Sequence, residues 1–205
     1  MSNSSKPRLV KCVVVGDDWI GKTCMVFACS KMFSLEPATR YNQSYGNVVI
    51  VDNTPVTLGL WDPCGISDYD RLIPLSFPQT DVFLLCYSMM NPFSLKQLAD
   101  KWYPTISHHC PGTPFFIVRV QDELLLENLI ERDQANQGNR GVRWIPPAEA
   151  QLVAVGLGAQ KHLTYSVSNQ EGLKRMFDEV IRTVLSPQTK PKRKLGFSFF
   201  SSKRH

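Results

Sequence analysis

The sequence lacks any apolar run of the ~20 residues that a membrane-spanning helix needs. It also lacks an apolar segment near its start, where a secretory leader would carry one, because residues 1–8 are mostly polar. We therefore expect neither secretion nor insertion into a membrane.

The cysteines show no pattern of pairing or of metal binding. None of the six forms a close CxxC pair or lies near histidines at the spacing of a metal site. They fall within apolar runs, at Cys12, Cys24, Cys29, Cys64, Cys86 and Cys110. Since disulfide frameworks belong to oxidising compartments, we predict free thiols in a reducing, cytoplasmic location.

Charged residues make up only 20% of the chain, and the net charge of +5 is unevenly placed. Basic residues gather after Pro187, at Lys190, Lys192, Arg193, Lys194, Lys203 and Arg204. The rest of the chain is close to neutral, so its charge predicts no nucleic-acid partner. A hydrophobic share of 43% over 205 residues suits one compact core, and we expect a monomer.

Short runs rich in apolar and β-branched residues indicate strands over residues 9–15, 47–52, 56–61, 82–87, 115–120 and 163–167. The second and third runs flank Asn53-Thr54, which predicts a hairpin turn there. Helical patterns cover residues 22–32, 93–109, 146–156 and 170–185. This alternation predicts an α/β fold around a mostly parallel sheet.

Two of the predicted helices carry clear apolar faces. Apolar residues recur at spacings of three and four at Leu95, Leu98, Trp102 and Ile106, and in the last helix at Leu173, Phe177, Val180, Ile181 and Val184. Between residues 124 and 143 the pattern weakens into a short helical stretch and an exposed insertion. We expect a flexible lead over residues 1–8, one domain over 9–186 and a disordered tail over 187–205.

A phosphate-binding pattern, G-x-x-x-x-G-K-[ST], stands between the first strand and the first helix. Its residues are Gly16, Asp17, Asp18, Trp19, Ile20, Gly21, Lys22 and Thr23. Glycines let backbone N–H groups converge on phosphate oxygens, Lys22 adds a point charge, and the Thr23 hydroxyl can ligate Mg²⁺. The pattern in this context predicts an anion cradle.

Further segments of the chain resemble the Rho/Rac family of small GTPases. They are Trp61-Asp62-Pro63-Cys64-Gly65, the run from Asp68 to Phe83, Lys101-Trp102-Tyr103-Pro104, His108-His109-Cys110-Pro111, and Gly172-Leu173 with Phe177-Asp178-Glu179. The likeness extends over about residues 9–185, and it is closest to the Rac branch.

The resemblance implies a Ras-like P-loop G-domain, with a six-stranded, mostly parallel sheet and helices on both faces. It implies GTP or GDP bound with Mg²⁺, and two switch segments that recruit effectors and respond to exchange factors. By position, metal contacts fall on Thr23, Thr39 and Asp62. Besides residues 16–23, nucleotide contacts fall on Cys24, Phe33, Asp62, Gly65, Gln121, Glu123, Ser166 and Val167.

The chain departs from the family where GTP is hydrolysed. Ile66 stands where the family has the glutamine that orients the attacking water, and an aliphatic side chain offers water no hydrogen bond. Asp18 replaces a glycine beside the γ-phosphate, and Trp19 replaces a small neighbour. We therefore expect very slow hydrolysis, a crowded loop and no catalytic side chain.

The charge of Asp18 has two interpretations. A carboxylate about 4 Å from the phosphates would repel them by roughly 1 to 4 kcal/mol. A carboxylate turned outward to solvent would not, and the sequence leaves both orientations open.

The base-reading motif is altered as well. Where the family has [NT]KxD, this chain has Val120-Gln121-Asp122-Glu123. Glu123 offers acceptors to guanine from a displaced position, and Gln121 lacks the stem and charge of lysine. Val167 still provides the backbone N–H that the family uses. The motif predicts weakened selectivity for guanine.

Switch I can be aligned with the family in two registers. Thr39 is the metal-sensing threonine if Ser44 is an insertion, whereas an ungapped register places Arg40 there. We favour Thr39. Either register changes the side chains that face effectors, so we expect weakened coupling between nucleotide and effector.

The tail after Pro187 lacks the C-terminal C-a-a-X cysteine that the family usually prenylates. Its basic residues, with Phe197, Phe199 and Phe200, suit reversible binding to an anionic membrane. The basic run also matches a nuclear import signal, and a solvated, inert end is the third interpretation.

Three hypotheses of function follow from these residues. We favour an atypical Rho/Rac-like GTP-binding signalling protein that acts on cytoskeletal or trafficking effectors and hydrolyses GTP slowly or not at all. The second is a scaffold that works independently of nucleotide exchange. The third is a working GTPase whose missing group comes from a partner in trans.

Overall fold

The structure is a computed structural model that describes residues 7–33, 44–63, 67–121, 144–166 and 169–186. The strands are β1 (Arg8–Val15), β2 (Ser44–Val51), β3 (Thr54–Trp61), β4 (Val82–Ser88), β5 (Phe115–Gln121) and β6 (His162–Ser166). The α-helices are α1 (Lys22–Phe33), α2 (Pro92–Gln97), α3 (Tyr103–His109), α5 (Pro147–Leu157) and α6 (Gln170–Leu185). The described residues also include a 3-10 helix, η1 (Ser67–Ser76), and a π-helical turn, η2 (Leu98–Trp102).

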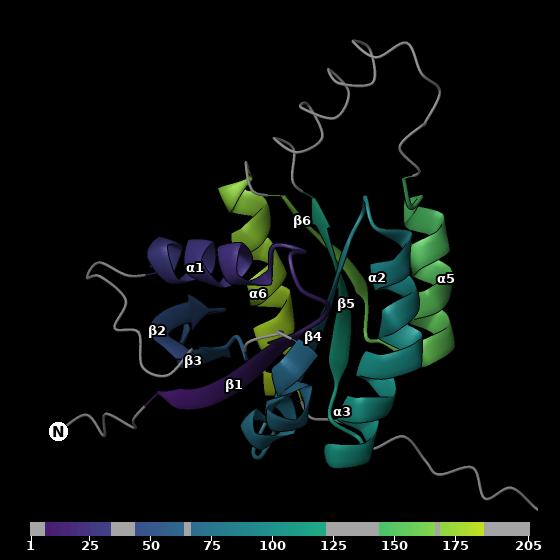
Figure 1. The fold of residues 1–205 in the computed structure, drawn as a ribbon. Coiled ribbons are helices and arrows are strands. Elements are labelled where there is room, and N and C mark those ends of the chain that lie inside the picture. Colours follow the sequence, from purple (N-terminus) through teal and green to yellow (C-terminus); the bar gives the residue numbers. More distant parts are fainter. Residues whose placement is uncertain (1–6, 34–43, 64–66, 122–143, 167–168, 187–205) are drawn as a thin grey trace, which may run out of the picture.

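The strands form one six-stranded sheet in the order β2-β3-β1-β4-β5-β6 (Figure 1). Within the described residues, β2 and β3 pair antiparallel and the other four strand pairs are parallel. The α/β fold with a mostly parallel sheet is therefore confirmed. The predicted helix over residues 93–109 is also present, with η2 between α2 and α3.

Helices cover both faces of the sheet (Figure 1). Because successive strand residues point to opposite faces, Val10, Cys12 and Val14 pack with α1 and α6, whereas Val13 and Val15 pack with η1, α2, α3 and α5. The residues predicted to face inward from the helices are all buried: Leu95, Leu98, Trp102, Ile106, Leu173, Phe177, Val180, Ile181 and Val184.

The hairpin turn lies one residue earlier than predicted. Val51 pairs with Thr54, so the two-residue loop is Asp52-Asn53 and not Asn53-Thr54. Both loop residues have positive φ, 47° and 60°, as in the type I′ turn that suits the twist of a hairpin and favours Asn and Asp. From α6, Arg182 donates two hydrogen bonds of 2.8 Å to the Asp52 carboxylate.

The loop after β1 lies where the topology opens a crevice. The neighbouring strands β1 and β4 are followed by α1 and α2, which pack on opposite faces of the sheet. Such a switch point leaves room for a ligand at the carboxyl ends of the strands. In Figure 1 the loop that joins β1 to α1 passes between α1 and α2.

A tyrosine–histidine pair links β4 to β6 across the intervening strand β5. The Tyr87 hydroxyl lies 3.0 Å from His162 Nε2, and the two rings stack with centroids 5.9 Å apart. Partial burial lowers the pKa of His162, and the nearby Arg119 cation lowers this pKa further. The fold therefore favours the neutral imidazole.

Acid should destabilise the protein through His162. Because its pKa is lower in the folded state, the unfolded state binds more protons at pH values between that pKa and the usual value of about 6.5. We expect the free energy of unfolding to fall as pH drops through this window, measured by urea denaturation at several pH values. His162→Gln, which cannot titrate, should reduce this slope, while the exposed control His108→Gln should keep it. An unchanged slope in His162→Gln would assign the pH dependence elsewhere.

Candidate functional site

The loop from β1 to α1 is pressed against β4 and admits only glycine at its first position. Gly16 has a φ of +147°, and a Cβ there would lie 2.4 Å from the Cys86 carbonyl oxygen and 2.8 Å from Ile20 Cδ1. Gly21 also has positive φ, +90°. Ile20 is buried and holds the middle of the loop against the core. The loop is thus closely packed against β4 and the hydrophobic core.

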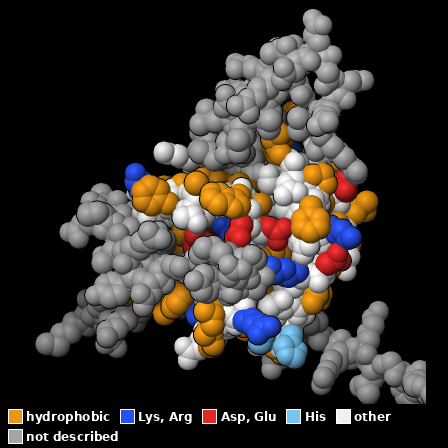
Figure 2. Space-filling model, in the orientation of Figure 1, with side chains coloured by type: hydrophobic (Ala, Val, Ile, Leu, Met, Phe, Trp, Pro, Cys, Tyr) orange, Lys and Arg blue, Asp and Glu red, His pale blue; other side chains and the backbone are white. Residues whose placement is uncertain are grey.

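Trp19 points away from the loop and into solvent. Its side chain is 99% exposed, so it does not crowd the loop as the sequence predicted. Its φ of 61° lies in the left-handed region, which bulky residues rarely adopt. Asp18 beside it is half-buried. Figure 2 shows Asp and Glu side chains gathered on this face, between α1 and α2.

Lys22 supplies a buried cation at the centre of the loop. It is only 6% exposed, and its Nζ donates to the Asp17 carbonyl oxygen at 2.5 Å. An ammonium group has three donors, and a buried charge is stable only beside compensating groups. The ammonium therefore suits a phosphate, the ligand that the sequence predicts for it.

Two oxygen ligands for a cation meet beside the loop. Thr23 Oγ1 donates to Asp62 Oδ2 at 2.5 Å, although the two residues are 39 positions apart. Asp62 directly follows β3, which neighbours β1, and it is 8% exposed. Hydroxyl and carboxylate oxygens suit Mg²⁺, which usually takes its remaining ligands from phosphates and water. The pair fits Mg²⁺ without further protein ligands, and among the described residues no cluster of three or more His, Cys, Asp or Glu could hold a metal.

Two of the residues predicted to contact the base, Gln121 and Ser166, lie side by side at the carboxyl ends of β5 and β6. Gln121 ends β5, Ser166 ends β6, and the two are partners in the parallel register. Phe33 is the last residue of α1. The predicted positions Thr39, Gly65, Ile66, Glu123 and Val167 lie outside the described residues.

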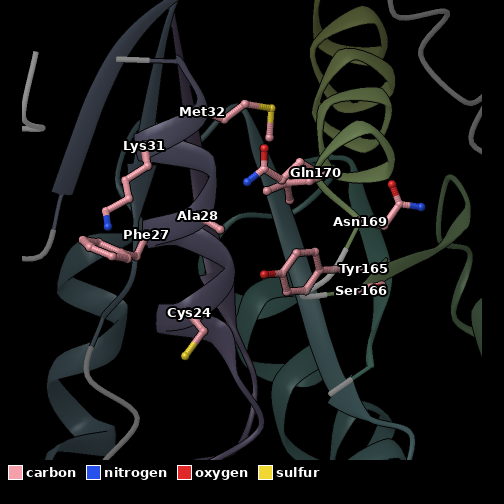
Figure 3. Close-up of a pocket in the computed structure, with 10 residues that line it drawn as sticks. Cys24, Phe27, Ala28, Lys31, Met32, Tyr165, Ser166, Asn169 and Gln170 are labelled. Atoms are coloured by element: carbon pink, nitrogen blue, oxygen red, sulfur yellow. The ribbon is translucent and has the colours of Figure 1, made fainter. Parts of the chain in front are cut away.

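A pocket of about 420 Å³ lies between α1, the end of β6 and the start of α6. Figure 3 shows Cys24, Phe27, Ala28, Lys31 and Met32 on α1, across from Tyr165, Ser166, Asn169 and Gln170. The lining combines apolar side chains with amide and hydroxyl groups, a mixture typical of small-molecule sites. Cys24 and Ser166, two of the predicted nucleotide contacts, thus line the same pocket.

The described cysteines are all free, as predicted: Cys12, Cys24, Cys29, Cys86 and Cys110. Cys86 lies below the loop, where burial raises the pKa of its thiol to about 12. A thiol with this pKa stays protonated at neutral pH and reacts little. Among the described residues, no helix is long and apolar enough to cross a membrane.

One contact to the loop was not foreseen from the sequence. Trp102, predicted only as part of an apolar helix face, donates from Nε1 to Asp17 Oδ1 at 2.8 Å. The signal available was chemical, because a buried indole N–H usually finds an acceptor.

A glycine-pinned loop, a buried lysine and a threonine–aspartate pair at a topological switch point define a P-loop nucleotide-binding domain. The sequence model of the Ras family matches residues 11–186, and the chain belongs to this family. It is thus a small GTP-binding signalling protein in the general sense, since members of the family bind GTP or GDP with Mg²⁺ and act through effectors and regulators.

Proposed function

We propose that the chain is an atypical, Rho/Rac-like member of its family that holds GTP and hydrolyses it slowly or not at all. It would act on cytoskeletal or trafficking effectors through its switch segments, and exchange factors or partner binding would control it. The observation that carries this proposal is a contrast. Lys22, Thr23 and Asp62 offer a cation and oxygen atoms that suit phosphate and Mg²⁺, whereas Ile66 has no group that can orient water.

Binding and hydrolysis depend on different parts of such a site. Binding needs the loop amides, the lysine and the metal ligands, whereas hydrolysis also needs a positioned water and charge stabilisation in the transition state. With GTP bound to this loop, the protein would have no side chain at position 66 to position the water. A protein of this kind stays in its GTP form until a partner displaces the GTP or supplies the group that orients the water.

Single-turnover hydrolysis tests this proposal. The wild-type protein loaded with GTP and Mg²⁺ should release phosphate much more slowly than the Ile66→Gln variant, because the glutamine amide can orient the water. Ile66→Leu is the control of similar size and should stay slow. Wild-type turnover equal to that of Ile66→Gln would contradict the proposal.

Removing the carboxylate of Asp18 should strengthen GTP binding. Asp18 is half-buried two residues after Gly16, on a face where Figure 2 shows further acidic side chains. Relief of 1 to 4 kcal/mol of repulsion corresponds to roughly 5-fold to 1,000-fold tighter binding. Titration of a fluorescent GTP analogue into Asp18→Gly should show this gain.

Two further variants separate the charge of Asp18 from its size. Asp18→Asn keeps the shape without the charge and should gain most of the increase. Asp100→Asn removes an exposed carboxylate from η2 and should leave affinity unchanged. If neither Asp18 variant binds GTP more tightly than the wild type, the carboxylate faces away from the phosphates.

The alternative function, a scaffold that works without nucleotide, is favoured by two features of the loop. Asp18 adds a negative charge where phosphates would bind, and the Lys22 ammonium is bonded to the loop itself at the Asp17 carbonyl. In this alternative neither GTP nor GDP changes partner binding. A pull-down of partners with GTP-loaded, GDP-loaded and nucleotide-free protein would then give equal yields.

A further inference from the structure

The helical segment from Pro92 to His109 contains a π-helical turn that ends at its tryptophan. The turn spans Leu98–Trp102 and joins α2 to α3. A π turn inserts an extra residue and rotates the following side chains about the helix axis, and such turns are frequent at functional sites. Trp102 stands at the end of this turn and is 2% exposed.

The indole of Trp102 reaches the phosphate loop. Its Nε1 donates to Asp17 Oδ1 at 2.8 Å across 85 positions of sequence. The Nε1–H is the single donor of an indole, so this bond satisfies the polar group of the ring. A bond to a carboxylate is stronger than one to a neutral acceptor.

Asp17 passes this constraint on to Lys22. Its side chain is held by Trp102, while its main-chain carbonyl accepts from Lys22 Nζ at 2.5 Å. The preceding Gly16 is confined by the Cys86 carbonyl. The orientation of the Asp17 peptide therefore sets both the position of the lysine and the direction of the adjacent loop amides.

Trp102 is also part of the hydrophobic core on this face of the sheet. The indole belongs to the same core cluster as Ile73 of η1 and Phe77, which directly follows η1. Lys101 Nζ lies 4.4 Å from the centroid of the ring. Trp102 is thus fixed by the core on one hand and bonded to the loop on the other.

We propose that Trp102 is a positioning residue for the phosphate loop, acting through Asp17 to hold Lys22 and the loop amides in the arrangement that binds phosphates. On this proposal Trp102 acts on the ligand only through Asp17. The inference rests on the proposed function only in taking a nucleotide as the ligand. It assigns a role to the Lys101-Trp102-Tyr103-Pro104 segment beyond filling the core.

Nucleotide release measures this role. Trp102→Phe keeps an aromatic ring but has no donor, and a fluorescent GDP analogue should leave it about 10-fold to 100-fold faster, the range for a lost charge-assisted hydrogen bond. Tyr103→Phe, its neighbour on the helix, is the control and should release at the wild-type rate. Asp17→Leu has no acceptor for the indole and should release the nucleotide fast. Asp17→Asn keeps an acceptor oxygen and should release it nearly as slowly as the wild type. In Asp17→Leu, adding Trp102→Phe should cause little further change.

Amide hydrogen exchange on nucleotide-free protein gives a second readout that needs no ligand. If Trp102 positions the loop, Trp102→Phe raises exchange over residues 16–23 selectively, whereas a merely structural role raises exchange throughout the helix and sheet. Two results together would support the positioning role and contradict the proposed function: a selective rise in loop exchange in Trp102→Phe, and a wild-type protein that binds no nucleotide. Unchanged loop exchange, or changes spread over the whole fold, would overturn the inference. If Trp102→Phe fails to fold, Asp17→Leu against Asp17→Asn gives the same comparison with the indole retained.

Discussion

Gly16→Ala is expected to destabilise the protein by about 3 to 5 kcal/mol, a large part of the roughly 5 to 15 kcal/mol that holds a typical domain folded. The added Cβ would lie 2.4 Å from a backbone oxygen of β4 and 2.8 Å from Ile20, and the φ of +147° disfavours any side chain. Backbone cannot move aside as a flexible side chain can. Urea denaturation followed by circular dichroism measures the loss.

A matched glycine elsewhere shows whether this effect is specific. Gly156 lies within α5, and a Cβ there meets nothing within 4 Å. Gly156→Ala should therefore stabilise the helix slightly, by about 0.5 to 1 kcal/mol. A Gly16→Ala variant that unfolds at the same urea concentration as the wild type would show that the loop is not packed against β4 as described.

Lys22→Met is expected to lower GTP affinity by about a thousandfold. A cation about 4 Å from a phosphate, at an effective dielectric of 20, contributes about 4 kcal/mol, and each 1.4 kcal/mol is tenfold in affinity. Methionine keeps much of the length and apolar volume of lysine without its charge. Equilibrium titration with GTP and Mg²⁺ measures the change.

The stability of the Lys22→Met variant separates lost binding from lost folding. Replacing a buried charge by an apolar side chain of similar volume is often neutral or stabilising, so the nucleotide-free variant should unfold no earlier than the nucleotide-free wild type. Lys174→Met removes an exposed lysine of α6 that pairs with Asp178, and this variant should bind GTP normally. Equal GTP affinity of Lys22→Met and wild type would remove Lys22 from the site.

The elements that the sequence predicted well are those with long, regular patterns. The spacing of Leu95, Leu98, Trp102 and Ile106 identifies a buried helix face because side-chain direction repeats along a helix. The apolar runs of the central strands are equally clear, since both faces of a parallel sheet are covered. Burial at these positions follows from the sequence alone.

Local backbone geometry was harder to predict. The turn at Asp52-Asn53 lacks the glycine that marks most type I′ turns, so the strand was extended by one residue and the turn was misplaced. The π turn before Trp102 leaves the apolar spacing nearly unchanged and so gives no signal in the pattern. The 3-10 helix η1 contains Pro74, and a proline in a sequence argues against a helix interior.

The site shows the same division between local pattern and tertiary contact. The loop residues Gly16 to Thr23 are contiguous and carry a known spacing, so their role was predictable. The bond from Trp102 to Asp17 joins residues 85 positions apart, and no local pattern encodes such a pair. The outward direction of Trp19 depends on its positive φ, which its residue type argues against.

The most direct test of the proposed function is the nucleotide that the protein carries when purified. The protein should be isolated without added nucleotide, denatured, and the released nucleotide identified by chromatography and mass spectrometry. A GTP-holding, hydrolysis-deficient protein predicts close to one GTP per chain. GDP in that amount would contradict slow hydrolysis, and a protein that is empty and also fails to bind added GTP with Mg²⁺ would contradict the proposal as a whole.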